Sequence, residues 1–138
     1  MIEQRPINDD AFEQFLREEK LMGSKCASCG ALYVPPRAIC IACHASKLDW
    51  VEASGIGKLI AFTSTAIAPP ALVEEGYGRD NPYCTGVIEL EEDVRVVARI
   101  NGLDARNPER VEIGAPMQIE FPHGDRPAAM LVFVPQAP

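Results

Sequence analysis

The stretch Cys26-Ala-Ser-Cys29-Gly-Ala-Leu-Tyr-Val-Pro-Pro-Arg-Ala-Ile-Cys40-Ile-Ala-Cys43 holds two Cys-x-x-Cys pairs with ten residues between them. A turn of this kind directs both sulfurs to one side, so two turns supply four thiolates to one tetrahedral ion and leave no position open. Gly30 suits the tight turn after the first pair because glycine tolerates a positive φ. The pattern predicts a structural metal site with Cys26, Cys29, Cys40 and Cys43 as ligands, one zinc ion as the occupant and iron as the alternative.

Other uses of these cysteines fit the sequence less well. Two disulfides would need an oxidising compartment, and the opening MIEQRPINDD lacks the basic and apolar stretches of a signal peptide. A redox motif occurs once, at the head of a helix, rather than as a matched pair. Residues 40–44 also match the C-x-x-C-H pattern of haem attachment, but haem would leave Cys26 and Cys29 without a role. A closed four-sulfur site, which holds structure and performs no chemistry, is the favoured interpretation.

The composition is that of an acidic globular protein. The 138 residues include 13 Lys and Arg against 20 Asp and Glu, for a formal charge of −7. An acidic surface repels phosphate backbones, and the basic residues are scattered from Arg5 to Arg126. The longest uncharged run is shorter than the roughly 20 residues that cross a bilayer. We therefore expect a cytoplasmic protein that binds neither nucleic acid nor membrane.

Around the cysteine segment the pattern predicts a helical start and a β-rich remainder. Asn8 supplies N-cap chemistry for a helix over residues 11–20, whose Phe12, Phe15 and Leu16 face needs a covering surface, either the barrel or another subunit. Apolar and β-branched runs predict five strands, at residues 56–66, 83–91, 94–100, 117–121 and 130–134. Five short strands with an insertion between the third and fourth match the order of an OB-fold, a partly open five-stranded barrel. A generic β-sandwich is the alternative.

Two of the connections between the predicted strands are long. Residues 68–82 contain three prolines and enough glycine to predict a loop without regular structure, of the kind that often carries an interaction surface. Asn107 to Arg110 can form one helical turn before the fourth strand.

Cys84 is the fifth cysteine and lies in a predicted strand. A catalytic nucleophile needs a nearby base, and the two histidines, His44 and His123, are remote from it in sequence. A buried free cysteine is the favoured interpretation. The residues do not assemble a nucleophile, a base and an orienting group, so no catalytic residue is predicted.

The run from Leu21 to Cys43 resembles the zinc ribbon of the DUF35 family, most specifically in its Cys-Gly, Pro-Pro-Arg and Cys-x-x-Cys elements. The family often has Pro and Gly around the second pair, where this chain has Ile41 and His44, and the four ligands stay intact. The resemblance implies a mainly β protein with a short N-terminal helix, a rubredoxin-like zinc ribbon and a five-stranded OB-fold barrel. We expect these parts at residues 1–22, 23–50 and 51–138. Further matches cover nearly the whole chain, at residues 50–57, 82–91, 95–99 and 113–114.

The resemblance also implies a function. Members of this family are usually non-catalytic partners of acyl-CoA enzymes, pairing with thiolase-fold proteins and sometimes with MaoC-type hydratases. The thiolase-fold partner would hold the catalytic residues for a thiolytic, retro-aldol or acyl-transfer step on a CoA thioester, with CoA near the subunit interface. Partner or CoA contacts are expected at Phe12, Phe15, Pro35, Pro36, Arg37, Tyr77 and Arg79. A nucleic-acid-binding module and a free-standing acyl-CoA-binding protein are the alternatives.

Overall fold

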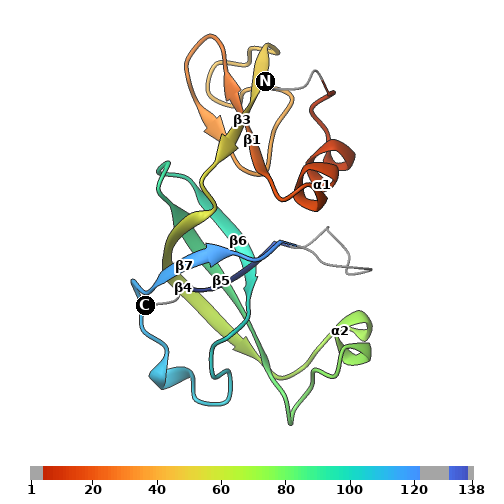
Figure 1. Cartoon of the computed structure of the whole chain (residues 1–138), viewed down its shortest axis with the longest axis vertical. Coiled ribbons are helices and arrows are strands. Elements are labelled where there is room, and N and C mark those ends of the chain that lie inside the picture. Colours follow the sequence, from red (N-terminus) through yellow and green to blue (C-terminus); the bar gives the residue numbers. More distant parts are fainter. Residues whose placement is uncertain (1–4, 122–130, 137–138) are drawn as a thin grey trace. The chain divides into compact units, whose positions relative to one another are not determined.

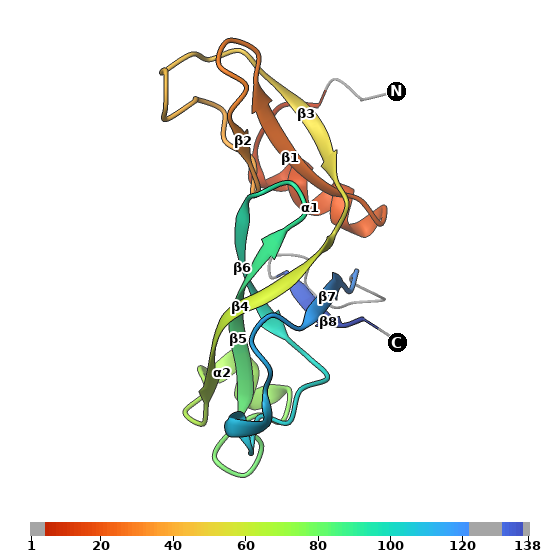
Figure 2. The same cartoon turned by 90° about the vertical axis from the view of Figure 1, so that its left-hand side faces the viewer.

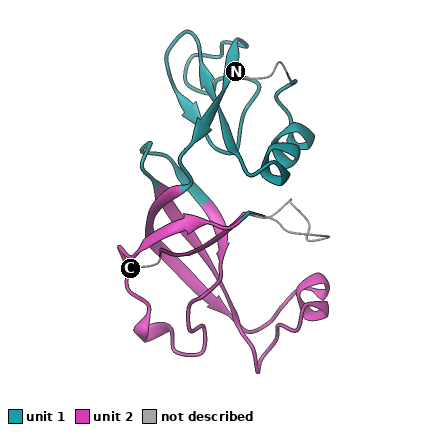
Figure 3. Ribbon diagram, viewed as in Figure 1, with its two compact units in different colours: residues 1–55, 90–96, 121–129 teal, residues 56–89, 97–120, 130–138 magenta. Residues whose placement is uncertain are grey.

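The computed structural model describes residues 5–121 and 131–136, which form a mainly β chain. In chain order its elements are α1 (Asp9–Arg17), β1 (Leu21–Cys26), β2 (Leu32–Tyr33), β3 (Leu48–Ala53), β4 (Ile56–Thr65), α2 (Pro70–Glu74), β5 (Tyr83–Leu90), β6 (Arg95–Ile100), the 3-10 helix η1 (Pro108–Arg110), β7 (Pro116–Ile119) and β8 (Val132–Pro135). They fall into two compact units, the first containing residues 5–55 and the second most of the barrel (Figure 3). In the described part of the chain, no helix has the length and apolar character needed to cross a membrane.

Helix α1 begins at its predicted cap. The side-chain oxygen of Asn8 accepts a hydrogen bond from the Ala11 amide at 2.9 Å, which satisfies one of the free N–H groups of the first turn. The helix starts at Asp9 and ends at Arg17, so the predicted span of residues 11–20 is shifted toward the C-terminus. Glu19 adopts a positive φ of 62°, which turns the chain out of the helix and into β1.

The first unit contains a three-stranded antiparallel sheet in the order β2-β1-β3, with α1 against β1 (Figures 1 and 2). The ring of Phe15 on α1 meets the ring of Trp50 on β3 edge to face, with 4.9 Å between their centroids. The Trp50 Nε1 group donates to the carbonyl oxygen of Arg5 at 2.9 Å, and the Arg5 guanidinium lies 4.1 Å from the Phe15 ring centroid. The apolar face of α1 is therefore covered by the ribbon sheet, which was neither of the two surfaces expected from the sequence.

Most of the second unit is a closed five-stranded barrel, with its strands in the order β4-β5-β6-β8-β7. This agrees with the predicted OB-fold. Strand β8 closes it by pairing in parallel with β6 and antiparallel with β7. Every second residue of β5 is buried, which is the pattern of a strand with one face toward a core. The buried side chains of the second unit include Leu59, Cys84, Ile88, Ala98, Ile100, Met117 and Phe133.

The strand predictions are correct in order and shifted at their ends. The last predicted strand, at residues 130–134, is observed as Val132–Pro135, and Met130 lies outside the described residues. The predicted helical turn at Asn107 to Arg110 is present as η1. The prediction of no regular structure in residues 68–82 is wrong, because α2 lies there. Pro70 takes the first helical position, where its fixed φ favours a helix, and Leu72 is buried.

Candidate metal centre and functional surfaces

The four predicted metal ligands come together at the end of the ribbon sheet. Cys26 is the last residue of β1, Cys29 follows in the adjoining turn, and Cys40 and Cys43 belong to a second turn before β3. All four sulfur atoms lie within 4.8 Å of one another. Cys26 Sγ lies 3.6 Å from Cys43 Sγ, and Cys29 Sγ lies 3.5 Å from Cys40 Sγ.

The backbone builds the two turns in the same way. The amide of Gly30 donates to the Cys26 carbonyl at 2.9 Å, and the amide of His44 donates to the Cys40 carbonyl at 2.8 Å. Both residues adopt a positive φ, 80° for Gly30 and 65° for His44. A positive φ costs a non-glycine residue roughly 1–2 kcal/mol of conformational energy. The second turn keeps the geometry of the first even though histidine replaces glycine there.

The sulfur cluster fits a tetrahedral metal ion. A Zn–S bond of about 2.3 Å places the sulfurs of a tetrahedral site about 3.8 Å apart, close to the two sulfur–sulfur distances above. Four thiolates complete the coordination shell, so the ion would cross-link the two turns and would have no free position for a substrate. This cluster is the one group of three or more potential ligands found within residues 5–121 and 131–136.

Tyr33 on β2 supports the cluster from the side. Its hydroxyl lies 3.2 Å from Cys40 Sγ and accepts a hydrogen bond from the Ile41 amide at 3.1 Å. The contact with Tyr33, together with the amide of Cys43, lowers the pKa of Cys40 to about 6. Hydrogen bonds of this kind favour the thiolate, which is the form that binds metal. This contact of Tyr33 with Cys40 was not predicted from the sequence.

The predicted contact residues of the ribbon differ in exposure. Pro35 and Arg37 are exposed and Pro36 is half-buried, whereas Phe12 and Phe15 lie in the interior of the first unit. The buried side chain of Ser24 holds Arg37 in place by accepting from its amide at 2.8 Å and donating to its carbonyl at 2.9 Å. The interior position of Phe12 and Phe15 leaves little of either ring for a partner to touch.

A buried arginine holds the loop of residues 68–82 in the second unit. The side chain of Arg99 on β6 pairs with Glu75 at 3.2 Å and lies 5.3 Å from the centroid of the Tyr77 ring. Only 7% of Arg99 is exposed. Tyr77 is half-buried and packs edge to face on Tyr83, while Arg79 is exposed beside a hollow of about 600 Å³. Arg99 therefore holds Tyr77, one of the two predicted contact residues of this loop, in place.

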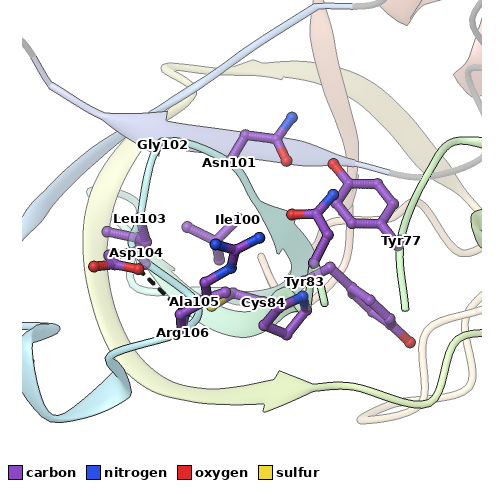
Figure 4. Close-up of a pocket in the computed structure, with 12 residues that line it drawn as sticks. Tyr77, Tyr83, Cys84, Ile100, Asn101, Gly102, Leu103, Asp104, Ala105 and Arg106 are labelled. Atoms are coloured by element: carbon purple, nitrogen blue, oxygen red, sulfur yellow. Dashed lines mark hydrogen bonds between the residues drawn. The ribbon is translucent and has the colours of Figure 1, made fainter. Parts of the chain in front are cut away.

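A second hollow, of about 470 Å³, lies at one end of the barrel next to this loop. Figure 4 shows the Arg106 guanidinium pointing into it from the segment after β6, with Tyr77 and Asn101 on the opposite rim. Cys84 contributes to its lining and is 1% exposed. Burial, and secondarily the charge of Asp104, raise the pKa of the Cys84 thiol. The structure supports the interpretation of Cys84 as a buried thiol, because a raised pKa disfavours the nucleophilic thiolate.

The raised pKa of Cys84 predicts a pH effect on stability. The folded chain keeps this thiol protonated at pH values where the unfolded chain, with a pKa of about 8.5, loses the proton. The stability that depends on Cys84 is thus present below pH 8.5 and is lost as the pH rises through the folded pKa. We expect wild type to lose stability relative to Cys84→Ala above about pH 8.5, by at most about 1.4 kcal/mol per pH unit. Urea unfolding of both proteins between about pH 7 and 10 measures this; parallel curves would contradict it.

Comparison with known proteins agrees with this architecture. Residues 14–49 match the family model for the "ChsH2, rubredoxin-like zinc ribbon domain", and residues 50–122 match that for the "ChsH2, C-terminal OB-fold domain". A "DUF35 domain-containing scaffold protein" of Methanocaldococcus jannaschii is 35% identical over 101 residues, which are 72% of this chain and 64% of that protein. The chain belongs to the DUF35 family. Its predicted fold class, with a short helix, a rubredoxin-like ribbon and an OB-fold, is confirmed.

Other relatives of this DUF35 chain have names that mention enzymes. A "Probable enoyl-CoA hydratase alpha subunit" of Thermomonospora curvata is 29% identical over 131 residues, which are 94% of this chain and 38% of that protein. The "Benzoylsuccinyl-CoA thiolase subunit BbsA" of Thauera aromatica is 31% identical over 86 residues, covering 62% of this chain and 55% of BbsA. The chain therefore spans well under two thirds of either protein.

Among solved structures, a chain of the "Ltp2-ChsH2(DUF35) aldolase" superimposes on the DUF35 chain with a TM-score of 0.71 and 27% identity. The match covers 95% of this chain and 98% of that one. The DUF35 chain is thus similar, over nearly all of its length, to a chain of this aldolase and, over 62% of its length, to BbsA.

Proposed function

We propose that this DUF35 chain is a non-catalytic, zinc-containing subunit of a thiolase-type enzyme that acts on a CoA thioester. The chain would stabilise a thiolase-fold partner and help to shape its CoA or substrate site, in a thiolytic, retro-aldol or acyl-transfer step. The observation that carries the proposal is the full-length match to a chain of the Ltp2-ChsH2(DUF35) aldolase. The names of BbsA and of the enoyl-CoA hydratase subunit add that relatives occur as subunits of enzymes for CoA thioesters.

The chemistry of the described residues supports an accessory role. The four ribbon cysteines leave a bound ion no open position, and the thiol of Cys84 is buried with a raised pKa. His44 lies beside the metal turn in the first unit, whereas Cys84 belongs to the second. Among the described residues that line the hollow beside Cys84 there is no histidine that could serve as its base.

Two surfaces would meet the partner or its CoA ligand. The first is the exposed ribbon segment with Pro35, Pro36 and Arg37, which Ser24 holds in place. The second is the loop with Tyr77 and Arg79, which Arg99 anchors to the barrel. An exposed arginine can bind either a phosphate of CoA or a carboxylate of the partner. A prearranged surface loses less conformational entropy on binding, which favours both sites as contacts.

The proposal is tested by reconstituting the enzyme. The tagged chain is purified from its source cells, and native mass spectrometry identifies what co-purifies and in what ratio. Thioester cleavage of acetoacetyl-CoA is then measured for the chain alone, the partner alone and the complex. We expect a thiolase-fold partner, activity in the complex and none in the isolated DUF35 chain. Turnover by the isolated chain, or a complex without a thiolase-fold protein, would refute the proposal.

A further inference from the structure

Charge is divided unevenly along the chain. Of its 20 acidic residues, none lies between Glu19 and Asp49, so all of them belong to the remaining segments. The basic residues in that interval are Lys20, Lys25, Arg37 and Lys47. The rest of the chain therefore has nine basic residues against 20 acidic ones, a formal charge of −11. Four thiolates with one divalent ion remove two charges from this interval and leave residues 20–48 at about +2. Residues 20–48, which include both metal turns, are a basic segment of an acidic protein.

The tip of this basic segment is apolar at its centre. Ile39 and Ile41, which flank the buried Cys40, are 58% and 62% exposed. Together with Arg37 and His44 they line a hollow of about 450 Å³. We call Arg37, Ile39, Ile41 and His44 the knuckle surface. A single exposed isoleucine is ordinary, but two beside one hollow offer an apolar centre, with the guanidinium of Arg37 as the charged group of the lining.

The knuckle surface is held in place by the structure beneath it. Ser24 makes two hydrogen bonds to the backbone of Arg37. The Ile41 amide donates to the Tyr33 hydroxyl at 3.1 Å, and the His44 amide donates to the Cys40 carbonyl at 2.8 Å. A surface that is already ordered loses little entropy on docking.

We propose that the knuckle surface docks onto an acidic surface of the partner subunit, with an apolar partner side chain filling the hollow between the two isoleucines. The inference rests on the proposed function for the kind of partner, and on the ribbon itself for the contact. Carboxylates of the partner would lie beside the apolar centre and pair with Arg37. Polar contacts at such a rim set orientation and association rate, while the buried apolar centre supplies most of the affinity.

The charge of the whole chain favours a protein partner over a polyanion. The electrostatic field of a charge extends about 8–10 Å at physiological salt, so a compact acidic patch interacts mainly with the charges that lie nearest to it. A nucleic acid or an anionic bilayer presents negative charge over a much larger area and would also face the segments that carry −11.

Two substitutions and a matched control test the docking surface. Ile41→Asp removes an apolar contact and adds negative charge, and Arg37→Glu reverses a rim charge without altering the isoleucines. Ile113→Asp makes the same change as Ile41→Asp at an isoleucine of the second unit that is 57% exposed. Each variant is checked for zinc content and titrated against the co-purified partner at about 50 and about 300 mM salt. We expect Ile41→Asp to weaken binding about 10- to 100-fold and Arg37→Glu about 10-fold, the latter chiefly at low salt. Ile113→Asp should stay within about threefold of wild type.

The outcomes separate this inference from the proposed function. A thiolase-fold partner that binds zinc-loaded Ile41→Asp and Arg37→Glu as tightly as wild type overturns the docking surface and leaves the proposed function standing. A partner of another fold whose binding depends on both residues supports the surface and overturns the function. Binding to a dT20 oligonucleotide or to phosphatidylserine vesicles that Arg37→Glu abolishes would replace the protein partner by a polyanion. Self-association that Ile41→Asp abolishes would replace it by a second copy. Failure of any protein to co-purify overturns both proposals.

Discussion

A Cys40→Ser variant is expected to purify without its metal and with an unfolded ribbon. A structural zinc ion contributes on the order of 10 kcal/mol to the folding of a small module, and a serine hydroxyl is a poor replacement for one of four thiolates. Cys40 is fully buried between Ile39 and Ile41, so its loss also releases the knuckle surface. The single tryptophan, Trp50, lies in the ribbon sheet, and its fluorescence therefore reports on this unit.

Zinc content by mass spectrometry, Trp50 fluorescence and partner binding measure the effect of Cys40→Ser, and Cys26→Ser should behave in the same way. The matched control is Cys84→Ser, the same substitution at a buried cysteine of the second unit. The control should keep one zinc per chain and lose roughly 1–3 kcal/mol of stability, because a hydroxyl is buried in place of a thiol. A Cys40→Ser protein that retains both its metal and its partner would show that the ribbon does not depend on the four-sulfur site.

A Trp50→Ala variant is expected to lose about 3–5 kcal/mol of unfolding free energy. Trp50 is 3% exposed, and it joins the sheet to α1 through Phe15 and to the preceding segment through the Arg5 carbonyl. Its removal leaves a cavity where α1 meets β3 and takes away the hydrogen bond from Trp50 to the Arg5 carbonyl. Because helices as short as α1 are marginal on their own, we expect α1 to unfold first.

The comparison of Trp50→Ala with Trp50→Phe separates the effect of the lost aromatic ring from the effect of the lost hydrogen bond to Arg5. Phenylalanine keeps an aromatic ring against Phe15 and loses only the hydrogen bond to Arg5 and part of the volume, so it should cost about 1–2 kcal/mol. Urea unfolding followed by far-ultraviolet circular dichroism, with zinc present throughout, gives both values. Equal stability of wild type and Trp50→Ala would mean that α1 is held by contacts other than Phe15 and Trp50.

Features of the chain that depend on neighbouring residues could be predicted from its sequence. The spacing of Cys26, Cys29, Cys40 and Cys43 specifies two turns of one geometry, and the structure brings the four sulfurs together. The cap at Asn8 and the order of the five barrel strands depend on local pattern in the same way, and both predictions hold.

Features that depend on distant residues were missed. The pairing of Phe15 with Trp50 joins positions 35 residues apart, and no local pattern indicates that the ribbon sheet covers α1. Arg99 looks like an exposed basic residue in sequence, yet it is buried against Tyr77. The basic character of residues 20–48 was visible in the sequence, but its signal is the absence of acidic residues between Glu19 and Asp49. Counting the basic residues, which are spread over the whole chain, does not detect it.

The parallel pairing of β6 with β8 bears on how the protein is made. Arg99 pairs with Val132 and Ile100 with Phe133, so the barrel cannot close until residues 132–135 have left the ribosome. The strands of the ribbon sheet and the four cysteines all lie before residue 54. The ribbon can therefore bind metal and pack while later residues are still being translated. During synthesis we therefore expect a folded ribbon to precede an open row of strands, with the unpaired edge of β6 exposed until β8 arrives.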